Sequence, residues 1–215
     1  MAKTKETAIT MQSIRPVEFM VTIEGDGDLV LNKMDDPTAR ALTDQRKDKA
    51  KSIEKPNYWE KVITSIHWYN GKPAEFTEET LKQCLDPKLN APCLTAFGLK
   101  NSFQDAVVRN EIDKYSTKFK AGVNIIAKGG LVPIEFAEHF VDEKLMSPKK
   151  GSPVLVNLNR FTGWSATLHI SMLETVYSIE QVVNIINLAG FGIGIGSGRT
   201  SGYGRYHVTD VKQVA

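Results

Sequence analysis

The sequence predicts an α+β fold of the ferredoxin-like type, in which one antiparallel sheet carries helices on one face and receives insertions. Two observations support this. The strongest apolar patterns follow the order strand, helix, strand, strand, helix, strand. Three of the expected strands are also apolar on only one side, which is typical of an antiparallel sheet with one covered face and one open face. With 215 residues the chain suits one domain, residues 1–215, with embellishments.

The first strand is expected at residues 17–23, where apolar and other side chains alternate. One side holds Val17, Phe19, Val21 and Ile23, and the other holds Glu18, Met20 and Thr22. Before it, residues 1–13 are polar and are interpreted as a loose N-terminal segment. After it, residues 33–57 are dominated by charge and are interpreted as a mobile insertion with at most a frayed helix. That insertion is either solvated surface or a flexible arm that adds phosphate contacts.

The middle of the chain supplies the first principal helix and several short strands. Residues 58–68 are aromatic and apolar and should pack beside the core. Residues 97–112 predict a helix whose apolar side includes Leu99, Phe103, Ala106 and Val107. Residues 123–127 and 131–134, separated by a Gly-Gly turn, predict a hairpin, and residues 154–158 predict a further strand.

The last fifty residues carry the clearest patterns. Residues 164–172 alternate cleanly and predict a strand. Ser178 and Gln181 form a capping-box sequence that opens a helix over residues 178–189. Residues 203–209 predict the last strand, with Tyr206 and Val208 on one face and Tyr203, Arg205 and His207 on the other.

Composition excludes several classes of protein. A formal charge of +2 is too small to argue for nucleic-acid binding through the global field, so such binding would need local patches. Cys84 and Cys93 are too few for a disulfide framework or a zinc ribbon. No metal-ligand spacing appears, so neither a metal nor a cofactor is expected. The start of the chain lacks an apolar signal sequence and no later stretch approaches a membrane span, which favours the reduced cytoplasm and no membrane partner.

The segment GFGIGIGSGRTSGYG, residues 190–204, is the strongest functional signal. Its seven glycines tolerate unusual backbone angles and close approach of a ligand. Free N–H groups in such a loop can form an anion-binding concavity, and Arg199 can add phosphate contacts. The order helix, loop, strand excludes the dinucleotide-binding fingerprint, and no P-loop sequence is present. The alternative is a sharp helix-to-strand connection without a ligand.

The expected open face of the sheet is a second candidate surface. Hydroxyl, histidine, arginine and tyrosine side chains would lie there, as on the RRM-like platforms that bind single-stranded nucleic acid. The alternative is that a second copy, or the insertion, covers this face. The face should display Glu18, Met20, Thr22, Ser165, Thr167, His169, Tyr203, Arg205 and His207.

The run GIGSGRTSGYGRYHV after an apolar helix resembles the C-terminal glycine-rich loop of the repeat-associated (RAMP) superfamily of CRISPR proteins. That resemblance implies a ferredoxin-like domain whose loop, between the last helix and the last strand, contacts RNA. Over most of its length the chain also resembles a group of uncharacterised bacteriophage proteins. The shared stretches are VTIEGDGDLVLNKMD, TAFGLKNSFQDAVV and the segment from WSATLHISMLE to SGYGRY.

Whether the chain is predicted to be an endoribonuclease depends on where its histidines lie. RAMP endoribonucleases often use a histidine on or near the first helix, and residues 97–112 contain none. His67 could reach the site only if the preceding segment folds over it. His139 lies in a stretch that resembles an amphipathic surface helix. If His169 and His207, both outward on strands, approach each other, they can act as an acid–base pair, but binding roles are more common for histidines in such positions.

The sequence therefore predicts a non-enzymatic, oligomeric, phage-derived protein that binds RNA or single-stranded DNA in the cytoplasm of the infected bacterium. Three alternatives stay open: a sponge for a nucleotide or cyclic-oligonucleotide signal, a metal-independent endoribonuclease, and a component of the phage particle. The predicted binding residues are Gly194, Gly196, Gly198, Arg199, Thr200, Ser201, Tyr203, Arg205, His207 and His169.

Overall fold

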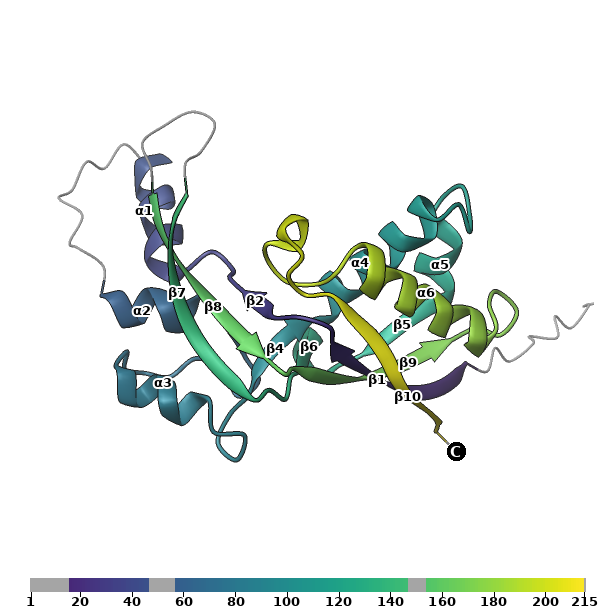
Figure 1. Cartoon of the computed structure of the whole chain (residues 1–215), viewed down its shortest axis with the longest axis horizontal. Helices are drawn as coiled ribbons and strands as arrows, with labels where there is room; N and C mark the ends of the chain where they lie inside the picture. The colour runs from purple at the N-terminus through teal and green to yellow at the C-terminus, as the bar shows by residue number, and fades with distance from the viewer. Residues whose placement is uncertain (1–15, 47–56, 147–153, 215) are drawn as a thin grey trace, which may run out of the picture.

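The structure is a computed structural model of residues 1–215, and residues 16–46, 57–146 and 154–214 are described. The predicted loose segment 1–13 lies outside the described residues, as do residues 47–56 of the predicted charged insertion. Figure 1 shows two groups of elements joined near the middle of the molecule: a sheet layered with helices, and a lobe that contains a long hairpin.

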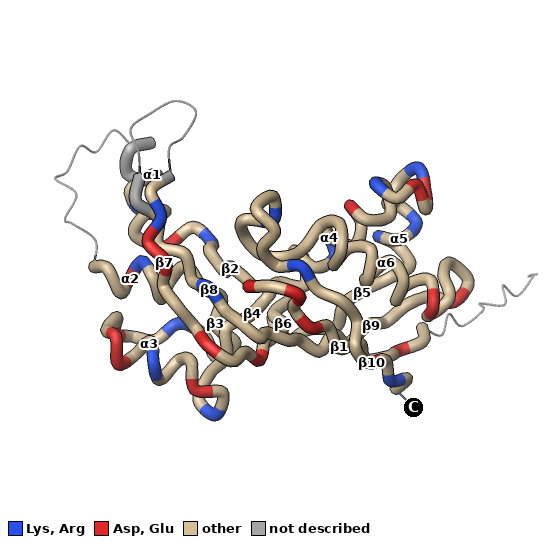
Figure 2. Tube along the Cα trace, in the orientation of Figure 1, with Lys and Arg blue, Asp and Glu red and all other residues tan. Residues whose placement is uncertain are grey.

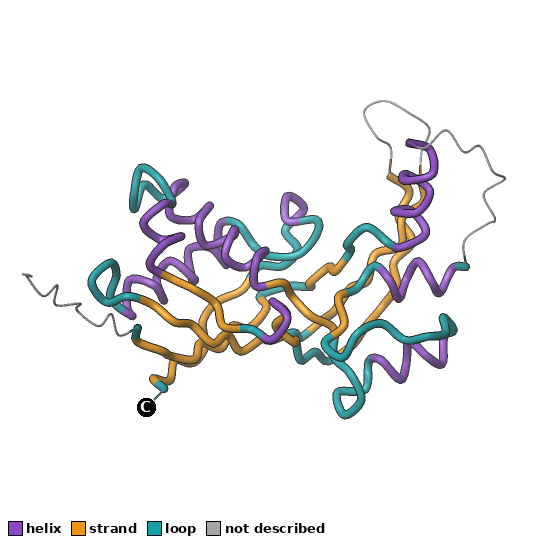
Figure 3. Tube along the Cα trace, turned by 180° about the vertical axis from the view of Figure 1, so that it is seen from behind, coloured by secondary structure: helices purple, strands orange, loops and turns teal. Residues whose placement is uncertain are grey.

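A four-stranded sheet forms the first group. It contains β1 (Val17–Gly25), β5 (Val123–Ile126), β9 (Ser165–Met172) and β10 (Tyr206–Gln213) in the order β10-β1-β9-β5. Each neighbouring pair is antiparallel. The two long helices, α4 (Ala96–Arg109) and α6 (Ile179–Gly192), cover one face, as the view from behind shows (Figure 3). The chain order β1, α4, β5, β9, α6, β10 confirms the predicted ferredoxin-like α+β fold.

Local sequence fixes where both helices begin. At α4, the Thr95 side chain accepts a hydrogen bond from the Gly98 amide at 3.0 Å. At α6, Ser178 and Gln181 form the predicted capping box. Helix α4 ends three residues earlier than predicted, because Glu111 adopts a positive φ of 55° that a helix does not allow.

Two insertions into the ferredoxin-like order build the second group. The first, between β1 and α4, contains β2 (Leu29–Leu31), α1 (Asp36–Arg46), α2 (Tyr58–Thr64), β3 (His67–Trp68), α3 (Glu78–Cys84) and β4 (Pro92–Thr95). The second, between β5 and β9, contains η1 (Lys128–Gly130), β6 (Leu131–Pro133), β7 (Glu138–Met146) and β8 (Val154–Thr162). They form two further sheets, in the orders β2-β8-β7 and β3-β4-β6. The remaining elements are α5 (Thr117–Gly122) and η2 (Arg199–Ser201).

Three local predictions were wrong. The stretch around His139 is not a helix but strand β7, because all nine of its residues pair with β8. Residues 131–134 do not pair with residues 123–127; β6 pairs with β4 of the other insertion. The last strand begins at Tyr206 rather than Tyr203, since the left-handed Gly202 and Gly204 keep the preceding residues in the loop.

The charged insertion contains more helix than its sequence suggests. Helix α1 runs for 11 residues. Arg40 on α1 forms an ion pair with Glu60 on α2 at 2.7 Å, and Asp36 pairs with Lys72. These partners lie outside the charged run itself, which is why its own pattern does not reveal the helix.

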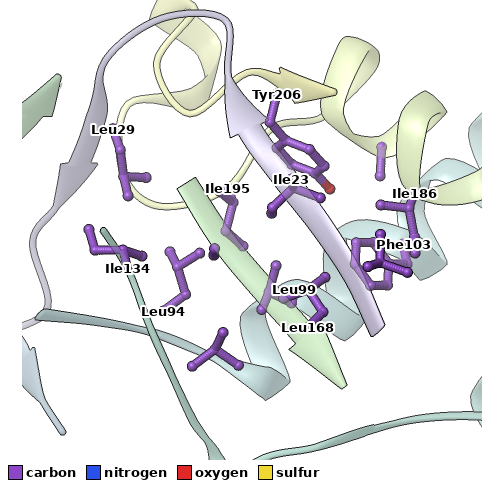
Figure 4. Close-up of a cluster of buried hydrophobic side chains, with 14 of the residues drawn as sticks. Ile23, Leu29, Leu94, Leu99, Phe103, Ile134, Leu168, Ile186, Ile195 and Tyr206 are labelled. Carbon is purple, nitrogen blue, oxygen red and sulfur yellow. The ribbon is translucent and has the colours of Figure 1, made fainter. Parts of the chain in front are cut away.

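One apolar core joins the sheet, the helices and the insertions. In Figure 4, Leu99 of α4 and Leu168 of β9 lie close to Leu94 of β4 and to Ile195, which belongs to the glycine-rich loop. The loop is therefore anchored in the core by an apolar side chain and is held in a defined position relative to α4 and the insertions.

Candidate nucleic-acid interface

The glycine-rich loop between α6 and β10 is shaped by contacts with its own chain. Gly194, Gly196, Gly198, Gly202 and Gly204 all have φ between 68° and 88°. A Cβ atom on Gly196 would come within 2.5 Å of the Val30 carbonyl oxygen, and one on Gly204 within 1.8 Å of the Ile195 carbonyl oxygen. Only glycine both adopts this positive φ readily and lacks the Cβ atom for which there is no space at these positions.

Hydrogen bonds hold this loop against the β1–β2 segment and α4. The Ser197 amide donates to the Val30 carbonyl at 2.8 Å, and the Gly204 amide donates to the Asp28 carbonyl at 2.8 Å. From α4, the buried Ser102 hydroxyl donates to the Gly194 carbonyl at 2.8 Å. The loop is therefore preorganised, so a ligand would not need to order it.

The tip of the loop leaves backbone donors available. No hydrogen bond within the described part of the chain uses the amides of Gly196, Gly198, Arg199 or Thr200. Gly198 is left-handed and the next residues make a 3₁₀ turn. A left-handed residue followed by a right-handed one directs successive N–H groups toward one concavity that suits anions. These amides and the exposed Arg199 are chemically able to contact phosphate.

Two adjoining hollows lie beside this tip. The first, of about 280 Å³, lies between the loop, the start of α4, the residues after β2, and β3. The second extends along α4 past Asp105 and Arg109. Asn101 and Arg199 line both hollows, so together they form one groove, which we call the loop groove.

Among the charged residues that line the loop groove, cations outnumber carboxylates. Lys33, Arg199 and Arg109 line it, against the single carboxylate of Asp105. The first turn of α4, whose dipole favours negative charge, also borders it through Phe97 and Gly98. This concentration of positive charge is the local patch that a net charge of +2 does not reveal.

His67 lies in the loop groove, because the insertion folds over the start of α4. Burial, and to a lesser extent the charge of Lys33, lowers the pKa of His67, which favours a neutral imidazole. Its strand partner Cys93 also lines the groove, and burial raises the pKa of this thiol to about 12. Cys93 is therefore a protonated thiol at neutral pH rather than a nucleophile.

The open sheet face is less suited to phosphate. His169 contacts Glu18 at 2.8 Å, and His207 contacts Asp26 at 2.6 Å, so both imidazoles already have carboxylate partners. Acidic positions gather where β1 runs into its turn, the stretch that includes Glu24 (Figure 2). A face with this many carboxylates repels a polyanion more than the loop groove does.

The predicted histidine pair does not form. In the sheet register, His169 lies opposite Met20 and His207 opposite Glu24, on different sides of β1 and four residues apart along it.

Of the residues expected on the open face, Tyr203 and Arg205 lie in the loop before β10. The Arg205 guanidinium donates to the Phe191 carbonyl at 2.7 Å, and the Tyr203 ring lies against Gly198. The roles of Arg205 and Tyr203 in binding stay predictions.

Several lining residues were missed from the sequence. Lys33, Asn101 and Arg109 carry no motif, and they lie in separate parts of the chain. Phe97 did give a signal: it falls outside the apolar side of its helix, and it is 76% exposed. A large apolar residue at the start of a helix but off its buried side is a weak indication of a surface contact.

No protein-family model matches the sequence, and no curated protein matches it. Among solved structures, the chain is similar to one in a cryo-EM structure of the type III-B Cmr-β bound to cognate target RNA. The TM-score is 0.52 at 12% identity, over 93% of this chain and 61% of that one. This likeness agrees with the ferredoxin-like α+β fold described above. A second neighbour, Cmr6 from Pyrococcus furiosus, has a TM-score of 0.33 at 10% identity, over 92% of this chain and 100% of that one.

The likeness to the first neighbour concerns the fold alone, and this chain spans only 61% of that neighbour's length. Within the described ranges, no three His, Cys, Asp or Glu side chains are placed to hold one metal ion. No helix of the described chain is long and apolar enough to cross a membrane.

Proposed function

We propose that the protein binds single-stranded nucleic acid, RNA or single-stranded DNA, along the loop groove and without cleaving it. The observation that supports this is that Arg199, together with the loop amides that have no partner among the described residues, lies where the two hollows meet. RNA is the first strand to test, because the Cmr-β neighbour with the same fold is bound to target RNA.

In this proposal, phosphates lie against the loop tip, where Lys33 and Arg199 neutralise them and the backbone amides donate to them. Gly196 and Gly198 are exposed, so a phosphate can reach their backbone amides. Arg109 extends the binding surface along α4. The open sheet face then contributes less than the sequence suggests, because its histidines bind carboxylates.

The biological setting is proposed from the sequence resemblance to bacteriophage proteins. In that setting, the protein would act in the cytoplasm of a bacterium infected by the phage. With a net charge of only +2 the affinity of one copy is expected to be modest, and several copies along one strand would strengthen it.

Binding is tested by fluorescence anisotropy of labelled 20-mer single-stranded RNA and DNA over a series of KCl concentrations. We expect K33A/R199A to weaken binding about tenfold or more at low salt. The slope of log K against log salt should become shallower by about 0.7 for each lost phosphate contact. K82A/K212A is the matched control, because it removes two cations that do not line the groove.

Absence of binding by the wild-type protein at low salt would contradict the proposal. So would an unchanged affinity and salt slope in K33A/R199A. If only K82A/K212A weakened binding, the strand would lie elsewhere on the molecule.

A further inference from the structure

The first hollow of the loop groove, beside the start of α4, has a composition that phosphate binding does not explain. Its volume of about 280 Å³ lies just below the range of roughly 300–1,000 Å³ that is usual for small-molecule pockets. A run of phosphates needs a cationic surface but no depth. A hollow that is partly apolar suits a single planar ring, such as a nucleobase, instead.

Part of the lining of the hollow is apolar. Leu31, Leu94 and Ile195 line it from three different segments. Phe97 also lines it and leaves 76% of its surface exposed. An aromatic ring at the edge of a nucleic-acid groove offers a platform on which a base can stack.

Three of the polar side chains that line the hollow are Asn32, His67 and Asn101. None of them makes a side-chain hydrogen bond with another described residue, although each can both donate and accept when the imidazole is neutral. Groups of this kind match the mixed donor and acceptor edge of a nucleobase. Phosphate, which offers only acceptors, does not need them.

The hollow also offers two cations that can hold a phosphate of the strand. Lys33 and Arg199 line the hollow, and neither forms an ion pair with a described residue. A phosphate held by these two side chains would leave its base free to turn toward Phe97.

We propose that this hollow is a nucleobase pocket, which takes one unstacked base of the bound strand between Phe97 and the edge groups of Asn32, His67 and Asn101. The proposal rests on the proposed function and deepens it: the protein reads bases as well as phosphates. In this pocket, Phe97 stacks on the base and Asn101 contacts the edge of the base.

The test compares two labelled 12-mers with the same sugar–phosphate backbone, an oligouridylate and an abasic strand, by anisotropy at one salt concentration. We expect the wild-type protein to prefer the base-carrying strand by about tenfold or more, as stacking of one base commonly supplies. F97A should lose most of this preference, and N101A part of it, while both keep the wild-type affinity for the abasic strand. F191A is the matched control, because Phe191 is 84% exposed and lines neither hollow.

Equal affinity of the wild-type protein for the two strands would overturn the nucleobase pocket and leave the proposed function intact. So would a preference that F97A and N101A retain. Failure to bind either strand would overturn both proposals. Because Phe97 and Phe191 are exposed, circular dichroism should show that both variants fold as the wild type does.

Discussion

At the residue scale, the glycine-rich loop shows how far a sequence motif can be interpreted. Seven glycines between residues 190 and 204 indicate unusual backbone angles, and five of them have φ between 68° and 88°. The sequence does not say what approaches the glycines, because that depends on segments far away in the chain. At Gly196 it is the Val30 carbonyl, and at Gly204 it is the Ile195 carbonyl.

Because the glycines differ in what a Cβ atom would meet, alanine substitutions in the loop should lower the free energy of unfolding by unequal amounts. In Gly202→Ala the new Cβ would meet nothing within 4 Å, so only the left-handed backbone costs energy, about 1 kcal/mol. In Gly204→Ala it would also meet a backbone oxygen at 1.8 Å. We expect G204A to lower the free energy of unfolding by at least about 3 kcal/mol more than G202A, in urea titrations. Equal losses would show that this oxygen does not constrain the position.

At the element scale, the long hairpin of β7 and β8 was only half predicted. The sequence around His139 is short and fits a helix and a strand about equally well, so the pairing with β8 decides the outcome. A buried network then fixes the hairpin on α2. Asn159 of β8 donates to the Val62 carbonyl at 3.0 Å and to the Ser65 hydroxyl at 2.8 Å. The Asn159 oxygen is left to accept from Nε2 of His139 at 2.9 Å.

This network makes stability depend on pH. Burial lowers the pKa of His139 below its ordinary value of 6.5. The unfolded chain therefore takes up a proton that the native state resists, and the free energy of unfolding should fall as the pH drops below about 6.5. H139Q keeps an N–H donor but does not titrate, so its stability should fall less between pH 7 and pH 5. His67, whose pKa is also lowered, is present in both proteins. Identical pH dependence in urea titrations would contradict this account.

At the scale of the whole molecule, the order of the principal elements was predictable and the groove was not. The ferredoxin-like core depends on patterns that are local to each strand and helix, so the sequence displays it. The loop groove is assembled from the ends of β2, β3 and β4, the start of α4 and the loop after α6. Each contributes a few residues without a motif, and β3 and β4 lie side by side only because they pair with each other.

The most direct test of the central claim, that nucleic acid lies in the loop groove, is to map contacts by photo-crosslinking. Single-stranded RNA that contains 4-thiouridine is irradiated with the full-length protein, and crosslinked peptides are identified by mass spectrometry. We expect adducts in residues 93–101 and 195–205, which line the groove or form its loop. Adducts confined to β1, β9 and β10, the strands of the open sheet face, would contradict the account.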